Sequence, residues 1–149
     1  AEMGMTTYSR VLLAAPGEVA ANAAKSLRDQ VGARCFYLTR LRYGNDRPIG
    51  LQYTTIMTAC CPDLARWDFS RESLYDVLSN HYQLTINKIT HTVTALAADD
   101  VQAELLAIDV GDTLLQINTT AYLENRAVIE ASVSYYRTDR YEFSITETL

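Results

Sequence analysis

The segment Ile129–Phe143, which reads IEASVSYYRTDRYEF, alternates apolar and polar side chains over its first half. On a β-strand, side chains two residues apart point to the same face, so this alternation predicts a strand with one apolar and one polar face. The apolar face carries Ile129, Ala131, Val133 and Tyr135, and the polar face carries Glu130, Ser132, Ser134 and Tyr136. A carboxylate, two hydroxyls and a phenol fit either a strand that faces solvent or one wall of a binding site.

Strand-like stretches dominate the rest of the chain. Strands are predicted at Ser9–Ala14, Cys35–Tyr43, Ile49–Thr58, Thr85–Leu96, Asp112–Tyr122, Val128–Arg137 and Tyr141–Ile145. Helices are predicted from about Glu18 up to Gly32, from Ser73 to about His81, and after Asp99 and Asp100 up to Gly111, with an irregular stretch at Cys60–Ser70. Because strands outnumber helices and most connections are hairpins, we expect an α+β fold with a mostly antiparallel sheet and flanking helices.

The stretch TRLRYGNDRPIGLQYT is predicted to form a hairpin, with its turn at Gly44, Asn45 and Asp46. On its first strand Arg40 and Arg42 share a face, about 7 Å apart. Two guanidinium groups on one face attract an anion, because each presents a planar fork of donors. An exposed edge strand with solvated charges explains the same pattern equally well. On the second strand, Gln52 lies on the face of Gly50 and Thr54.

Ser73 and Tyr75 begin the second predicted helix, in the sequence SLYDVLSNHY. The free N–H groups and the positive dipole end of a helix N-terminus form an anion site. N-capping by Ser73 is the simpler structural explanation, and both roles are compatible.

Composition excludes several classes of function. The net charge of −5 and the isoelectric point near 4.9 argue against binding of nucleic acid by this chain, because that binding depends on Lys and Arg contacts to phosphates. No apolar run approaches the ~20 residues that cross a bilayer, so we expect a soluble cytoplasmic protein without membrane contact. Residues 1–8, AEMGMTTY, are expected to be an unstructured or artificial start, followed by one domain at 9–149.

The cysteines and histidines suggest neither a metal site nor a catalytic centre. The three cysteines are predicted to be reduced thiols, since Cys60 and Cys61 are neighbours followed by a proline. Only His81 and His91 accompany them, without CxxC or HxxxH spacing, so we expect no structural zinc and no cofactor. The chain contains no GxSxG elbow and no Gly-rich phosphate loop.

The segment IEASVSYYRTDRYEF resembles the closing motif of the UbiC transcription regulator-associated (UTRA) domain, the effector-binding half of GntR-type repressors of the HutC subfamily. The order of segments agrees over nearly the whole chain from Ser9: a strand, TRLRYGNDRPIGLQYT, DFSRESLYDVL, AELLAIDVGDTLLQINTTAY and the closing run. The resemblance implies a chorismate-lyase-like fold, a homodimer and a small anionic effector, either a sugar phosphate or an organic acid. It also implies a DNA-binding winged helix-turn-helix domain that is absent from this chain.

Carried over by position, the resemblance implies two groups of effector-binding residues. The group that holds the anionic part is Arg40, Arg42, Ser73 and Tyr75, and the group that contacts the rest of the effector is Gln52, Glu130 and Tyr136. Gln52 departs from the family pattern, which usually has a glutamate there. A neutral amide both donates and accepts hydrogen bonds, so its preferred ligand pattern differs.

Two other functions are compatible with the same sequence. A chorismate-lyase-like enzyme would share the fold and would also use an arginine-lined pocket with a carboxylate. A dimerisation module without a ligand would use the strand edges that such a sheet leaves open. The closing motif favours the regulatory domain over the enzyme. The hydroxyl-rich strand faces and the arginine pair make a purely structural role less attractive.

Overall fold

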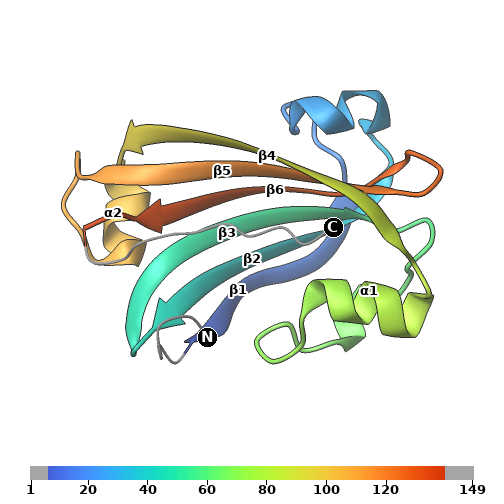
Figure 1. Ribbon diagram of the computed structural model, residues 1–149, viewed down its shortest axis with the longest axis horizontal. Coiled ribbons are helices and arrows are strands. Elements are labelled where there is room, and N and C mark those ends of the chain that lie inside the picture. Colours follow the sequence, from blue (N-terminus) through green and yellow to red (C-terminus); the bar gives the residue numbers. More distant parts are fainter. Residues whose placement is uncertain (1–6, 140–149) are drawn as a thin grey trace.

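Antiparallel strands form one curved sheet in the computed structural model, which describes residues 7–139 (Figure 1). Within these residues the sheet has six strands in the order β1-β2-β3-β6-β5-β4. Their bounds are Thr7–Glu18 (β1), Arg34–Gly44 (β2), Arg47–Met57 (β3), Ile86–Ala97 (β4), Thr113–Leu123 (β5) and Val128–Arg137 (β6). The predicted α+β fold with a mostly antiparallel sheet is confirmed. The strand predicted at Tyr141–Ile145 lies outside the described residues.

The β2–β3 hairpin forms where the sequence predicts it. Asn45 and Asp46 have φ angles of 49° and 65°, so both central turn residues are left-handed, as in the type I′ turns that suit the twist of paired strands. The resulting register pairs Arg40 with Gln52 and places Arg42 opposite Gly50. The hairpin therefore brings the two arginines and the amide onto one surface.

The N-terminal region differs from the prediction. The expected helix from Glu18 is wrong: β1 continues to Glu18, and a 3₁₀-helix covers only Lys25–Gln30. The strand passes through Pro16, which an edge strand tolerates because its open side needs no N–H donor. Tyr8, expected to precede the domain, pairs with Tyr43 of β2, and the two rings stack at 4.9 Å.

Two α-helices begin at the predicted caps. Helix α1, Leu74–Tyr82, starts after Ser73, whose side chain accepts a hydrogen bond from the Asp76 N–H. Helix α2, Asp100–Leu106, starts after Asp99, which forms a reciprocal capping box with Gln102. It ends at Ala107, which adopts a left-handed conformation with φ 56°, and not at Gly111 as predicted.

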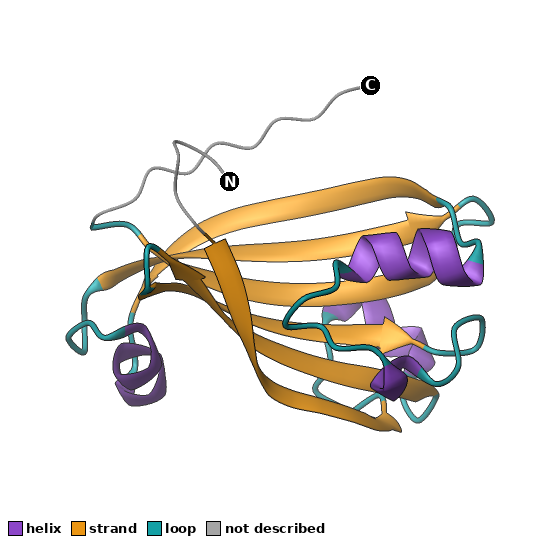
Figure 2. Cartoon of the chain, turned by 90° about the horizontal axis from the view of Figure 1, so that it is seen from below, coloured by secondary structure: helices purple, strands orange, loops and turns teal. Residues whose placement is uncertain are grey.

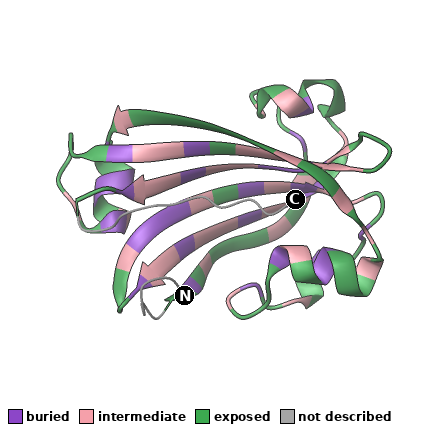
Figure 3. Ribbon diagram, viewed as in Figure 1, coloured by how far each residue is buried: buried purple, intermediate pink, exposed green. Residues whose placement is uncertain are grey.

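The two helices pack on opposite faces of the sheet and near opposite ends of it (Figures 1 and 2). Helix α1 covers Phe36 and Leu38 on one face. Helix α2 covers Leu41, Leu51 and Leu114 on the other. Burial is concentrated on the inner strands, whereas the edge strand β4 is mostly exposed (Figure 3).

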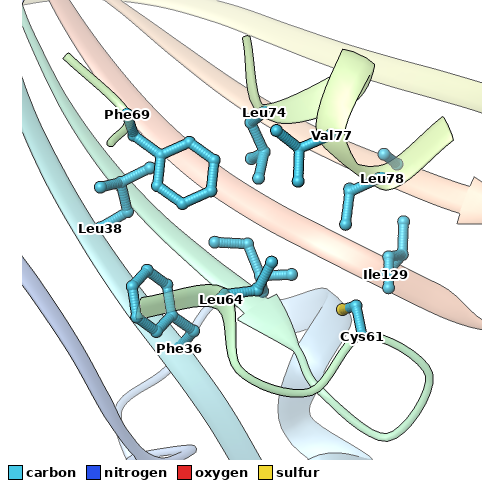
Figure 4. Packing of buried hydrophobic residues seen from close by; sticks show 11 residues of the cluster. Phe36, Leu38, Cys61, Leu64, Phe69, Leu74, Val77, Leu78 and Ile129 are labelled. Carbon is cyan, nitrogen blue, oxygen red and sulfur yellow. The ribbon is translucent and has the colours of Figure 1, made fainter. Parts of the chain in front are cut away.

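The irregular segment between β3 and α1 completes the core beneath α1. It contains one 3₁₀-turn, Leu64–Arg66, and inserts Cys61, Leu64 and Phe69 between the sheet and the helix (Figure 4). Each of the larger apolar side chains contributes roughly 1.5–3 kcal/mol when fully buried. This packing fixes the polypeptide that leads into the N-terminus of α1.

A bulge in β6 changes one residue of the predicted apolar face. Ala121 pairs with Glu130 but Tyr122 pairs with Val128, which leaves Ile129 as the extra residue. Ile129 therefore packs under α1 with the core on the side of Glu130 (Figure 4). The prediction that Ile129 lies opposite Glu130 is wrong, because a bulge interrupts strict alternation.

Candidate functional site

A cavity of about 610 Å³ lies between the α1-side face of the sheet and the segment 69–75 that leads into α1. All six described strands contribute lining residues, so the sheet forms its floor. Most of the lining residues are polar, with arginines, hydroxyls, phenols and one buried carboxylate among them. Its volume is within the ordinary range of small-molecule sites, roughly 300–1,000 Å³.

Two arginines of β2 form the cationic wall of the cavity. Arg42 Nη1 donates a hydrogen bond to Ser9 Oγ of β1 at 3.1 Å. Arg40 Nε is buried and has no hydrogen-bond partner among residues 7–139. Burial lowers the pKa of Arg40, and the neighbouring charge of Arg42 lowers it further. Neither arginine forms an ion pair with a carboxylate of the described residues, so the positive charge of this wall is available to a ligand.

A buried carboxylate faces the same cavity from β6. Glu130 is 4% exposed, and its Oε1 accepts a hydrogen bond from Tyr75 Oη at 3.0 Å. Its Oε2 is buried without a partner in the part of the chain that the structure describes. Burial raises the pKa of Glu130 to about 7, against the opposing effects of the Tyr75 hydrogen bond and the charge of Arg40. The pKa of Tyr75 is also raised, by burial first and by Glu130 second.

An amide and a phenol connect the two sides of the cavity. Gln52 Nε2 of β3 donates to Tyr136 Oη of β6 at 2.8 Å. Gln52 Oε1 is buried and has no partner within the described residues. Among the described residues that line the cavity, three fully buried side-chain atoms have no hydrogen-bond partner: the donor Arg40 Nε and the acceptors Gln52 Oε1 and Glu130 Oε2.

The N-terminus of α1 opens onto the cavity. Ser73 and Tyr75 both line it, and Ser73 Oγ accepts from the Asp76 N–H at 3.4 Å. The positive end of a helix dipole favours an anion within about one turn. Asp76 in the same turn is exposed, and its carboxylate already places one negative charge near this end of the helix.

The structure brings all predicted site residues together. The seven that line this cavity are Arg40, Arg42, Gln52, Ser73, Tyr75, Glu130 and Tyr136. Ser132 and Ser134, from the predicted polar face of β6, line it as well.

Sequence reasoning missed Ser9, Arg71 and His91, which also line the cavity. Ser9 enters because β1 pairs it with Arg42, and His91 enters because β4 pairs it with Thr119. The pairings of Ser9 and His91 join segments about 30 residues apart in the sequence, so no local pattern indicates them, whereas Arg71 lies in the irregular segment just before Ser73.

The described residues offer no constellation for metal binding. Within the range 7–139, no group of three or more His, Cys, Asp or Glu side chains could hold a metal ion. The three cysteines are unpaired, with Cys35 and Cys61 buried and Cys60 exposed. The described part also contains no helix long and apolar enough to span a membrane. What the cavity offers chemically is hydrogen bonding and charge.

The sheet thus carries an arginine-walled cavity of a size that suits a small molecule. The UTRA domain model matches residues 2–142, and the chain belongs to this family. The fold and family predicted from the closing motif are therefore confirmed.

Named relatives are transcriptional regulators. The chain is 31% identical over 106 residues to the HTH-type transcriptional repressor NagR of Bacillus subtilis, covering 71% of this chain and 43% of that protein. It is 30% identical over 117 residues to the histidine utilization repressor of Pseudomonas aeruginosa, covering 77% and 46%. The chain thus spans less than half the length of these relatives. Both relatives are named as repressors, which agrees with the expectation of a regulatory domain.

Solved structures share the fold. The effector domain of PhnF from Mycobacterium smegmatis matches with a TM-score of 0.84 and 22% identity, covering 98% of this chain and 90% of that one. The C-terminal domain of the histidine utilization repressor from Pseudomonas syringae matches with a TM-score of 0.84 and 22% identity, covering 97% and 100%.

Proposed function

We propose that this domain is the sensor of a GntR-type transcriptional regulator and binds a small organic anion in the cavity. The anionic group lies against Arg40 and Arg42, near the N-terminus of α1, and the remainder contacts Gln52, Glu130 and Tyr136. The observation that carries the proposal is the arginine wall, whose charge no carboxylate of the described residues neutralises by ion pairing.

The unpaired polar atoms support a ligand in the same place. A buried polar atom without a partner costs about 1–3 kcal/mol, so folded proteins rarely leave several in one place. Arg40 Nε, Gln52 Oε1 and Glu130 Oε2 are three such atoms around one cavity. A ligand that accepts from Arg40 and donates to the two acceptors would satisfy all three.

The proposed output is control of DNA binding by a winged-helix domain outside this chain. These relatives are longer than this chain, which matches only about half of each of them, and they are named as HTH-type transcriptional regulators. A ligand shifts such a protein between conformations only by its difference in affinity for them. The proposed ligand has the higher affinity for the conformation whose DNA-binding domains fit the operator less well, so its binding increases the population of that conformation.

The test of ligand binding is a thermal-shift panel of phosphate esters, phosphonates and carboxylates. We expect at least one anion to raise the melting temperature, and we expect Arg40→Ala and Arg42→Ala to reduce that response. Arg10→Ala is the matched control, because Arg10 is an exposed arginine of β1 that does not line the cavity. A panel without any stabilising anion, or a response that all three variants retain, would contradict the proposal.

We also propose that the domain forms a homodimer, as the family resemblance implies. The sheet leaves two edge strands, β1 and β4, and β4 is exposed along most of its length. Open edges of this kind are places where a second chain can pair or pack. Sedimentation equilibrium tests this: a dimer at micromolar concentration supports it, and a monomer at every concentration rejects it.

A further inference from the structure

We propose that Gly50 is a positioning residue of the cavity: its missing side chain lets Tyr136 lie against β3 and hold the Gln52 amide with its oxygen towards the ligand. The inference rests on the proposed function, because it concerns a ligand in the same cavity. It adds a residue outside the predicted set and a requirement on the ligand, which must carry a hydrogen-bond donor close to its anionic group.

The contact between Gly50 and Tyr136 is closer than any side chain at position 50 allows. The two residues are opposite one another on β3 and β6, and Gly50 is buried. A Cβ atom on Gly50 would lie 2.5 Å from Cε1 and 2.6 Å from Cδ1 of the Tyr136 ring. Real Cβ contacts are essentially never shorter than 3.0 Å. Because the obstructed atoms belong to a side-chain ring and not to the backbone, we expect an alanine here to displace the ring before it disturbs the sheet pairing.

The ring position fixes the Gln52 amide. With the ring over Gly50, Tyr136 Oη accepts from Gln52 Nε2 at 2.8 Å, which leaves Oε1 as the unpaired atom. Arg40 is the cross-strand partner of Gln52 and has only donors and a positive charge, so it disfavours the flipped orientation, in which the amide NH₂ group would be the unpaired one. The close packing of Tyr136 on Gly50 thus places the phenol where it holds the Gln52 amide. The Gln52 Oε1 atom is then the hydrogen-bond acceptor that stays unpaired.

An acceptor at this point selects between anions. The neutral amide oxygen does not neutralise Arg40, so the arginine wall keeps its charge for the anionic group. The same oxygen must receive a donor when the cavity closes around a ligand, because a buried unpaired acceptor is costly. An anion with a neighbouring hydroxyl or N–H group satisfies both requirements, whereas an anion on a bare alkyl chain satisfies only the first.

Two phosphate monoesters separate these cases. Glycerol 3-phosphate and n-propyl phosphate have the same charged group and the same three-carbon chain, and only the former carries hydroxyls. We expect the unmodified domain to bind glycerol 3-phosphate about tenfold more tightly, the equivalent of about 1.4 kcal/mol. We expect Gly50→Ala and Tyr136→Phe to lower this affinity ratio towards one.

Gly17→Ala is the matched control for Gly50→Ala. A Cβ on Gly17 would lie 2.8 Å from Cε2 of Tyr37, so the substitution also pushes a tyrosine ring, and neither residue lines the cavity. The ratio should stay near tenfold in Gly17→Ala. An unmodified domain that binds both esters equally, or a Gly50→Ala variant that keeps the full ratio, would overturn the inference.

A second measurement examines the contacts without a ligand. In the ligand-free domain, the side-chain amide signals of Gln52 in a ¹⁵N–¹H NMR spectrum should move in both Gly50→Ala and Tyr136→Phe, and should stay in place in Gly17→Ala. Unmoved Gln52 signals would overturn the positioning role even where anions bind. Moved signals with neither ester binding would support the positioning role and overturn the ligand requirement, whereas the proposed function would be overturned only by failure of the whole anion panel.

Discussion

Replacing Glu130 by glutamine should stabilise the ligand-free domain at neutral and alkaline pH. Glu130 is 4% exposed, and burial raises the pKa of its carboxyl from 4.5 to about 7. At about 1.4 kcal/mol per pH unit, this difference makes the ionised carboxylate unfavourable by up to about 3 kcal/mol. Glutamine keeps an oxygen for the Tyr75 hydroxyl and removes the charge.

The effect depends on pH in a defined direction. The folded state holds the Glu130 proton more tightly than the unfolded state does, because the folded pKa is the higher one. The carboxyl therefore gives its full contribution to stability below about pH 4.5 and loses it progressively as the pH rises to about 7. Glutamine does not titrate, so the advantage of Glu130→Gln grows through this window and is constant above it.

Urea unfolding at pH 4.5 and pH 8 measures the difference. We expect a gain in the free energy of unfolding of about 1–3 kcal/mol at pH 8, relative to the difference at pH 4.5, and a rise in melting temperature of about 2–4 °C per kcal/mol. The control is Glu124→Gln, because Glu124 is exposed in the turn between β5 and β6. An equal difference between variant and unmodified chain at both pH values would refute the reasoning.

Three further changes probe the surroundings of the cavity. Phe69→Ala should cost about 3–5 kcal/mol of unfolding free energy in urea titrations, because Phe69 is 2% exposed in the core under α1. Asp99→Ala should cost about 1 kcal/mol in the same assay, since the capping box of α2 is lost; no change would show that the box contributes nothing. Tyr75→Phe should raise the pKa of Glu130 above about 7, since the Tyr75 hydrogen bond lowers it; a ¹³C NMR titration of the Glu130 carboxyl that gives a lower pKa would contradict this.

Local patterns were sufficient to predict much of the fold. The β2–β3 hairpin follows from alternating strands around a turn in which Asn45 and Asp46 accept positive φ angles. Helices α1 and α2 follow from Ser73 and Asp99, whose side chains accept from N–H groups within three residues. Each of these signals acts over a few residues, so it is visible in the sequence.

The errors come from interactions that connect distant segments. The helix predicted from Glu18 relied on helix-forming residues, but pairing with β2 holds Glu18 in a strand opposite Arg34. Tertiary pairing overrides weak intrinsic propensity. Likewise, the bulge that turns Ile129 towards α1 exists only in the pairing of β6 with β5.

The sequence was sufficient to predict most residues of the candidate site, but not the contacts between strands or the raised pKa of Glu130. Alternation on single strands placed Arg40 with Arg42 and Glu130 with the serines of β6, because face sharing is a local property. The proximity of Ser9 to Arg42 requires the β1–β2 register. The raised pKa of Glu130 requires its burial, which depends on the core packed under α1.

The most direct test of the proposed anion site is the Nε–H signal of Arg40 in a ¹⁵N–¹H NMR spectrum during titration with glycerol 3-phosphate. Arg40 Nε is buried and without a partner among residues 7–139, so a bound phosphate oxygen should become its acceptor. We expect this signal to move downfield and to saturate, while the Nε–H signal of the exposed Arg10 stays in place. Equal small movements of both signals without saturation, or no movement of the Arg40 signal, would contradict an anion site in this cavity.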